Sequence, residues 1–272
     1  MESLKNVTTN SYNTAVGSES LKLNTGEYNT AIGYFALQQN TTEDNNTAVG
    51  YEALTANTGS NNNALGSEAL EKNTTGVQNT GIGYQALREN TTGSYNTAVG
   101  NYALDACTTS SSLTAVGLNA LSSVTSGIVQ CTAVGANALK LNTGSYNTAI
   151  GHGSLDANTS GVANVAVGDG SLGGNTTADY NTAMGHFALN TNTTGEKNTA
   201  IGSNALRYAT TANNNTSVGH YSSTAITTGY NNTSVGYYAL SGCTTGFANA
   251  TFGYSAGGSI STGANNLSLI HI

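Results

Sequence analysis

The sequence predicts an all-β fold, a β-solenoid or β-roll of about 16 stacked coils with about 17 residues in each coil. Three observations predict it. The string NTAVG, or a close variant, recurs along the chain at a nearly constant spacing. A leucine usually follows its glycine by four positions, and an asparagine usually follows that leucine. The chain has 34 glycines, no proline and only 8% charged residues, against about 25% charged residues in ordinary domains.

The glycine that ends each string defines the repeat. A unit of about 17 residues is too short for a helix-turn-helix or a propeller blade, but it suits one coil of a stacked β-structure. We expect the glycine to mark a corner that needs a positive φ or close contact with another backbone. It recurs at Gly17, Gly33, Gly50, Gly66, Gly83, Gly100, Gly117, Gly135, Gly151, Gly168, Gly185, Gly202, Gly219, Gly236 and Gly253.

The residues before the glycine are expected to form the strand of each coil. The position directly before it always holds Val, Ile, Leu, Met or Phe, from Val16 to Phe252, and such residues suit a half-buried pleated surface. The position before that is always small, as at Ala15 and Ala31, and it faces the opposite side of the strand. This small residue allows close approach of another layer. That layer is either a second sheet of the same chain or another chain.

Two asparagine columns are expected to form buried corners. The first column opens the string NTAVG, and the second follows the leucine by three residues. Substitutes in the second column are Val7, Cys107, Val124, Ala209 and Cys243, and those in the first are Leu113 and Cys131. Exposed polar positions do not drift to such residues, so we expect buried amides that hydrogen-bond from coil to coil. Changes in repeat length fall after the second column, which predicts an outer turn there. The expected structural ladder comprises Asn13, Asn29, Asn46, Asn79, Asn96, Asn147, Asn181 and Asn198 with Gly17, Gly33, Gly50, Gly83 and Gly100.

The three cysteines are expected to be structural. Cys107, Cys131 and Cys243 each occupy an asparagine position. We interpret them as small buried thiols. A catalytic cysteine would need a base partner, and none recurs nearby.

Charge and motifs exclude several function classes. The net charge is −7, with no basic patch that could neutralise phosphates, so we expect no nucleic-acid partner. No apolar run approaches the roughly 20 residues that span a bilayer, so we expect no membrane insertion in this segment. No serine-histidine-aspartate arrangement, zinc-spaced cluster, phosphate-binding loop or dinucleotide fingerprint is present. We therefore expect neither an enzyme nor a cofactor.

One column holds candidate metal ligands. His152, Asp169 and His186 occupy the position after the glycine in three successive coils, and two histidines with a carboxylate can bind a transition metal. The same position holds Tyr34 and Tyr51 in other coils. That variety is typical of a tolerant surface column, so the expected metal content is none.

The repeat resembles two kinds of known protein. NTAVGYxALxxNTTG looks like the repeats of phage tail fibres and adhesin-like proteins, and NTAVG resembles the SVAIG core of trimeric autotransporter adhesin heads. The resemblance covers Ser3 to Asn266 and implies a left-handed parallel β-roll assembled as a homotrimer. It is specific for architecture and weak for ligand.

These observations together predict a structural role. We expect a structural repeat rod of an extracellular or virion fibre, a tail-fibre or adhesin shaft or head, that serves attachment to a host or a surface. The partners would be other copies of the chain and a cell-surface glycan or receptor. One alternative is a glycan-binding module that uses the outer tyrosine column. Another is ice binding through the threonine column, although those threonines share the strand face of the apolar position, which we expect to contact the core.

Both ends are expected to be cut. Leu4 and Val7 are in register with later positions, so Met1 begins within a repeat. We expect a single repeat domain over 1–266. The tail LSLIHI matches no repeat position and resembles the translation of a transposase end sequence used in sequencing libraries. Residues 267–272 are therefore expected to be an artefact at the end of a fragment of a longer environmental reading frame, with genuine capping sequence as the alternative.

Overall fold

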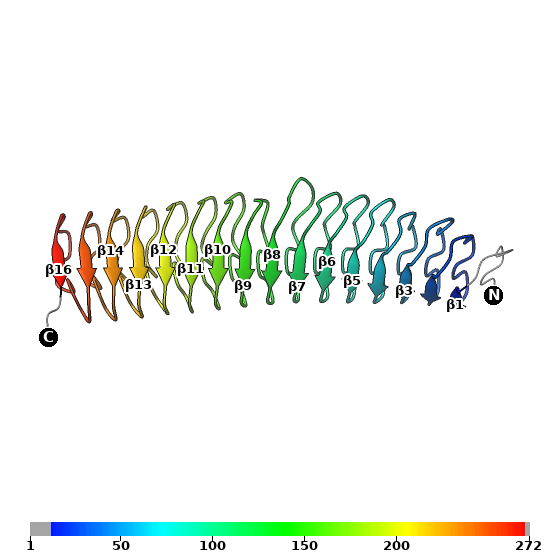
Figure 1. Cartoon of the computed structure of the whole chain (residues 1–272), viewed down its shortest axis with the longest axis horizontal. Helices are drawn as coiled ribbons and strands as arrows, with labels where there is room; N and C mark the ends of the chain where they lie inside the picture. The colour runs from blue at the N-terminus through cyan, green and yellow to red at the C-terminus, as the bar shows by residue number, and fades with distance from the viewer. Residues whose placement is uncertain (1–11, 270–272) are drawn as a thin grey trace. The chain divides into compact units, whose positions relative to one another are not determined.

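The computed structural model describes residues 12–269, and Leu4 and Val7 lie outside them. The described residues form an all-β structure with one three-residue strand per coil and no helix, and none of them lies in a helix that could cross a membrane. The chain divides into two compact units, Met1–Ala136 and Asn137–Ile272. The parallel coils in each unit (Figure 1) confirm the predicted β-solenoid, whereas its handedness and its continuity as one domain over 1–266 stay predictions.

Each unit contributes eight of the sixteen strands in the described residues. The first unit holds β1 (Thr14–Val16), β2 (Thr30–Ile32), β3 (Thr47–Val49), β4 (Asn63–Leu65), β5 (Thr80–Ile82), β6 (Thr97–Val99), β7 (Thr114–Val116) and β8 (Thr132–Val134). The second holds β9 (Thr148–Ile150), β10 (Val165–Val167), β11 (Thr182–Met184), β12 (Thr199–Ile201), β13 (Thr216–Val218), β14 (Thr233–Val235), β15 (Ala250–Phe252) and β16 (Leu267–Leu269).

Neighbouring strands within a unit pair in parallel without any offset. Thr30 lies opposite Thr47, and Ala31 lies opposite Ala48. The same correspondence relates β11 to β12, where Ala183 lies opposite Ala200. Equivalent residues of successive coils therefore form straight columns. Successive members of a column lie about 4.8 Å apart, which is the usual spacing of paired strands.

The small middle residue of each strand faces the interior of its own coil. Ala31 is fully buried, whereas Ile32, the next residue, is 40% exposed. Thr30 precedes Ala31 and is half-buried, so Thr30 and Ile32 share the outward face, as the alternation of strand side chains requires. The expectation that the apolar and threonine positions contact the core is therefore wrong. The small position packs against the opposite wall of the same chain and is not available to a second chain.

That opposite wall runs from the repeated glycine to the second asparagine. Its buried residues are an alanine and a leucine, such as Ala53 and Leu54, which complete the core facing the strand alanines. The wall is hydrogen-bonded from coil to coil although it is not a strand, with Leu54 N donating to Ala69 O at 3.1 Å. Leu54 has a φ of 51°, and the other buried leucines of this column have similar values. Burial of the leucine and its hydrogen bond offset the cost of this left-handed conformation.

The end of the described chain corrects one expectation. Leu267–Leu269 form β16, which pairs in parallel with β15. Ser268 lies opposite Thr251 in the small inward column, and Leu269 lies opposite Phe252 in the outward column. Residues 267–269 therefore follow the repeat, contrary to the expectation that 267–272 match no position. Residues 270–272 lie outside the described part of the chain.

Candidate functional site

The repeated glycine is required by both its backbone angle and its surroundings. Gly50 has a φ of 146°, a region that residues with a side chain rarely adopt. A Cβ atom on Gly50 would also overlap the carbonyl group of Gly66 in the next coil. The structure places Gly17, Gly33, Gly83 and Gly100 in the same situation. This column holds successive coils in contact at the corner after the strand.

The first asparagine column binds backbone. It comprises Asn13, Asn29, Asn46, Asn62, Asn79 and Asn96 in the first unit, and Asn147, Asn164, Asn181, Asn198, Asn215, Asn232, Asn249 and Asn266 in the second. Asn96 is typical of it: Oδ1 accepts a hydrogen bond from Leu113 N at 3.0 Å, and Nδ2 donates to Ser110 O at 2.9 Å. Asn181 does the same with Asn198 N at 2.9 Å and Gly195 O at 2.8 Å. The column thus joins each coil to the next through main-chain groups.

The second asparagine column binds other members of the same column and the backbone carbonyl groups of its own turn, such as Gly76 O, which accepts from Asn73 Nδ2 at 2.9 Å. It comprises Asn24, Asn40, Asn57, Asn73 and Asn90 in the first unit, and Asn142, Asn158, Asn175 and Asn192 in the second. Asn73 Nδ2 donates to Asn57 Oδ1 at 2.7 Å, and Asn90 Nδ2 donates to Asn73 Oδ1 at 2.6 Å. The next coil has Cys107 in this position, and Asn90 Oδ1 is a buried acceptor without a partner. The ladder therefore ends with one unused acceptor.

The three cysteines are buried thiols in positions that asparagines hold in other coils. Cys107 and Cys243 are fully buried, and Cys131 is 1% exposed. Burial raises the pKa of the Cys107 thiol to about 11, and burial also raises the pKa of Cys243. A thiol in this state is a poor nucleophile at neutral pH. The surroundings of these cysteines fit a packing role.

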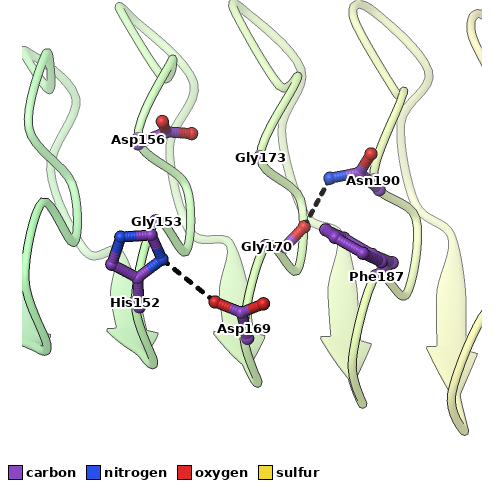
Figure 2. A pocket seen from close by; sticks show the side chains of 8 residues that line it. All are labelled: His152, Gly153, Asp156, Asp169, Gly170, Gly173, Phe187 and Asn190. Carbon is purple, nitrogen blue, oxygen red and sulfur yellow. Dashed lines mark hydrogen bonds and ion pairs between the residues drawn. The ribbon is translucent and has the colours of Figure 1, made fainter.

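In the candidate metal column, Asp169 lies between His152 and His186 and contacts both of them. His152 Nδ1 lies 3.0 Å from Asp169 Oδ1 (Figure 2), and His186 Nε2 lies 3.6 Å from Asp169 Oδ2. Each ring thus meets a different oxygen of one carboxylate. No group of three potential ligands within residues 12–269 is arranged to hold a metal ion. His152 and Asp169 also line a surface pocket of about 300 Å³.

The exposed tyrosines mostly cover one another. The rings of Tyr34 and Tyr51 stack with centroids 5.8 Å apart, and those of Tyr237 and Tyr254 stack at 5.4 Å. Tyr221 and Tyr238, in the adjacent column, stack at 5.0 Å. A sugar would bind such a ring through its face. One face of each ring is therefore already in contact with its partner, which leaves one face per ring for a glycan on the tyrosine column.

The outward face of the strands carries an unbroken apolar column, which we call the outward apolar column. It comprises Val16, Ile32, Val49, Leu65, Ile82, Val99, Val116 and Val134 in the first unit, and Ile150, Val167, Met184, Ile201, Val218, Val235, Phe252 and Leu269 in the second. None of these side chains is buried, and Met184 and Phe252 are 43% and 42% exposed. The sequence shows this column, because the position before the repeated glycine is always apolar. That these side chains point outward was not predicted from the sequence.

The chain matches no protein-family model, and no curated protein matches it. The fold and the columns described above therefore provide the evidence for its function. Among these columns, the outward apolar column is the one that presents a hydrocarbon or thioether side chain, partly exposed, in every coil from Val16 to Leu269.

Proposed function

We propose that this chain is a structural, non-catalytic segment of an extracellular or virion fibre, of the tail-fibre or adhesin type, and that it assembles as a homotrimer. The observation that carries the proposal is the outward apolar column. Side chains such as Ile150, Met184 and Phe252 remain roughly two-fifths exposed while the alanines between them are buried. A contiguous exposed apolar surface of this kind marks an interaction site.

The partner best suited to this column is another copy of the same chain. A partner must offer apolar groups at the coil spacing of about 4.8 Å over many coils. A second copy has this spacing because it has the same register. Closed symmetry would then cover the column on every chain at once. The resemblance to trimeric autotransporter heads adds the expectation of three chains around one axis.

The remaining observations agree with a structural role. The side chains that could take part in chemistry are spread along the coils, and the buried thiols are poor nucleophiles. The hydrogen bonds of the first asparagine column join one coil to the next wherever the column holds asparagine, as it does from Asn147 to Asn266 in the second unit. A stack bonded in this way suits a spacer that holds an attachment site away from a particle or a cell surface.

Sedimentation equilibrium of the whole chain tests the assembly. We expect the mass of three chains for the unaltered protein. The double variant Met184→Lys and Ile201→Lys should sediment as a monomer, because it places two charges in the outward apolar column. The control double variant Thr177→Lys and Thr194→Lys adds the same charge at exposed turn positions and should remain a trimer. A monomeric unaltered protein at micromolar concentration would refute this assembly.

The threonine column favours ice binding as a second candidate function. Threonines such as Thr182, Thr199 and Thr233 lie beside the outward apolar column. Within residues 12–269, the hydroxyls of the strand threonines make no hydrogen bond to the chain, so they can bind ordered water. Thermal hysteresis measurements distinguish the two candidates. Ice binding predicts hysteresis that falls in a Thr199→Tyr variant, whereas a trimer that covers this face predicts none.

A further inference from the structure

A notch on the second unit has features of a binding site that the fibre role does not explain. The pocket of about 300 Å³ is lined by His152, Gly153, Asp156, Asp169, Gly170, Gly173, Phe187 and Asn190. Figure 2 shows these residues on three successive coils, with His152 and Asp156 at one side and Phe187 and Asn190 at the other. The pocket is separate from the outward apolar column and from the stacked tyrosines.

Two glycines create this notch. Gly153 and Gly170 occupy the position two residues after the repeated glycine, with φ values of 59° and 60°. Tyr102 and Phe187 hold the same position in other coils at 58° and 52°. The backbone therefore accepts side chains here, and glycine is not needed for its conformation. A Cβ on Gly153 would meet only Asp156 Oδ2, at 4.0 Å, so its effect is to leave space open.

Phe187 forms one wall of the notch. A Cβ on Gly170 would meet Phe187 Cε1 at 2.5 Å, so the ring lies directly over this glycine. The guanidinium carbon of Arg207 lies 5.0 Å from the centroid of the Phe187 ring. Elsewhere in this column, Tyr221 and Tyr238 cover each other by stacking. Because Gly153 and Gly170 have no side chains, no equivalent ring covers Phe187 from the preceding coils.

The polar groups around the notch are mainly hydrogen-bond acceptors. Asp156 and Asp169 supply carboxylates, and burial raises the pKa of Asp156 from its usual value. Asn190 Nδ2 donates to Gly170 O at 2.7 Å, which fixes the amide and leaves its Oδ1 as an acceptor. A ligand that matches these groups must donate several hydrogen bonds and must also present an apolar face to Phe187.

We propose that this notch binds one neutral hexopyranose unit of a glycan, stacked on Phe187 and hydrogen-bonded through its hydroxyls to Asp156, Asp169 and Asn190. The C–H face of a pyranose is attracted to the negative face of an aromatic ring. From Gly153 to Phe187 the notch spans two coil spacings, or about 10 Å, which accommodates one sugar ring. The carboxylates disfavour an acidic sugar. Arg207 disfavours an organic cation, because its guanidinium lies 5.0 Å from the centroid of the same ring and repels a second positive charge there.

Saturation-transfer difference NMR on the whole chain tests this proposal. The probes are the methyl pyranosides of glucose, galactose and mannose, with N-acetylneuraminic acid and choline as the acidic and cationic comparisons. We expect saturation transfer to at least one neutral pyranoside, with a Kd on the order of 1 mM because the site is shallow. Transfer to none of the three neutral pyranosides, or stronger binding of choline or of the acidic sugar, would overturn the proposal.

Two variants and a control locate the binding. Gly153→Tyr fills the notch in a position that accepts tyrosine in another coil, and Phe187→Ala removes the stacking wall. Each should weaken pyranoside binding by roughly tenfold or more. Asn119→Tyr adds the same side chain to the same column in the first unit and should leave the affinity unchanged. Binding that survives Gly153→Tyr would place the sugar elsewhere and refute this site, whatever the oligomeric state of the chain.

Discussion

The second unit contains two regions that differ in a single column. From Asn142 to Asn192, every coil has an asparagine in both columns. From Ala209 onward, the second column is apolar and continues with Ile226, Cys243 and Ile260, while the first column keeps its asparagine as far as Asn266. The stack continues through both regions with the same register. Within the second unit, the first column is therefore the one that keeps its asparagine in every coil.

The hydrogen bonds explain this difference. In the first region, Asn175 Nδ2 donates to Asn158 Oδ1 at 2.7 Å, a bond between members of the second column. Where the second column is apolar, side-chain bonds along the first column are shorter: Asn232 Nδ2 donates to Asn215 Oδ1 at 3.0 Å, against 3.3 Å for Asn164 Nδ2 to Asn147 Oδ1 in the first region. The bonds of the first column to the backbone remain. A column that bonds main-chain groups of the next coil is costlier to replace than one whose bonds run along the column and within its own turn, although Leu113 and Cys131 replace the first column in two coils of the first unit.

Placing a charge in the first column should have the largest effect. In Asn96→Asp, one carboxylate oxygen would face Ser110 O, which now accepts a hydrogen bond from Asn96 Nδ2. Because this site is buried, we expect a loss of about 3 kcal/mol in the free energy of unfolding. The control is Ser94→Asp, since Asp44 and Asp179 occupy the same turn position in other coils. The control should change stability by less than about 0.5 kcal/mol, and equal denaturation midpoints for the two variants would disprove the buried ladder.

Removing an amide from each column should give unequal losses. Asn181→Ala leaves Asn198 N without its partner and leaves Gly195 O with only Asn192 Nδ2, so we expect it to cost about 2 kcal/mol. Asn175→Ala should cost about 1 kcal/mol less, because its backbone partner, Ala178 O, keeps the hydrogen bond from Asn164 Nδ2, and its other partners are side chains of its own column. Urea denaturation of both variants measures the difference. If Asn175→Ala proved the more damaging, the roles assigned to the two columns would be reversed.

Extending the second column by one member should stabilise the first unit. Asn90 Oδ1 is buried without a partner, and the following position holds Cys107. The variant Cys107→Asn would supply an Nδ2 donor to it, so we expect a gain of about 1 kcal/mol. Cys243→Asn is the matched control, because Ile226 precedes it and offers no acceptor. The idea fails if thermal denaturation shows the same shift for both variants.

The smallest effect concerns the reactivity of Cys107, the thiol that replaces an asparagine in the second column of the first unit. The pKa of Cys107 is raised from 9.0 to about 11 by burial. At pH 8 the folded protein should therefore react with a thiol reagent roughly a hundredfold more slowly than an exposed cysteine. Its reaction rate should keep rising with pH up to about 11. Labelling of the variant Cys131→Ser, Cys243→Ser isolates Cys107, and rapid labelling of the folded chain would show that this corner opens readily.

Much of the fold could be predicted from the sequence because each column has its own chemistry. The recurrence of glycine gave the coil length, and substitutions such as Leu113 and Cys107 indicated buried corners before any contact was known. Which side of the strand faces the interior of the coil could not be predicted in this way. Ala31 and Ile32 are both apolar, and hydrophobicity does not distinguish the interior of a coil from a surface that meets another molecule. The narrow space opposite the leucine wall decides it, because only the small residue fits inside.

The notch was missed for a related reason. Gly153 and Gly170 resemble the many other glycines of the chain, and their meaning depends on the conformation of their column. Only the positive φ of residues such as Tyr102 and Phe187 shows that side chains are accepted there. The last strand was missed because Leu267–Leu269 has the sequence LSL where most strands have TAV or TAI, and it keeps only the small residue between two larger ones.

The absence of any offset between strands has a consequence for how genes of this type can change. The strand of each coil pairs with its neighbours in the same register, so it can pair in that register with the strand of any other coil. Loss of residues 51–66 by recombination would join Gly50 to Ser67 and bring Thr47 opposite Thr80, with every column preserved. Duplication of the same segment would be equally neutral. The number of coils can therefore vary between generations as a whole-number change in length, while the lateral surface of the protein keeps its pattern.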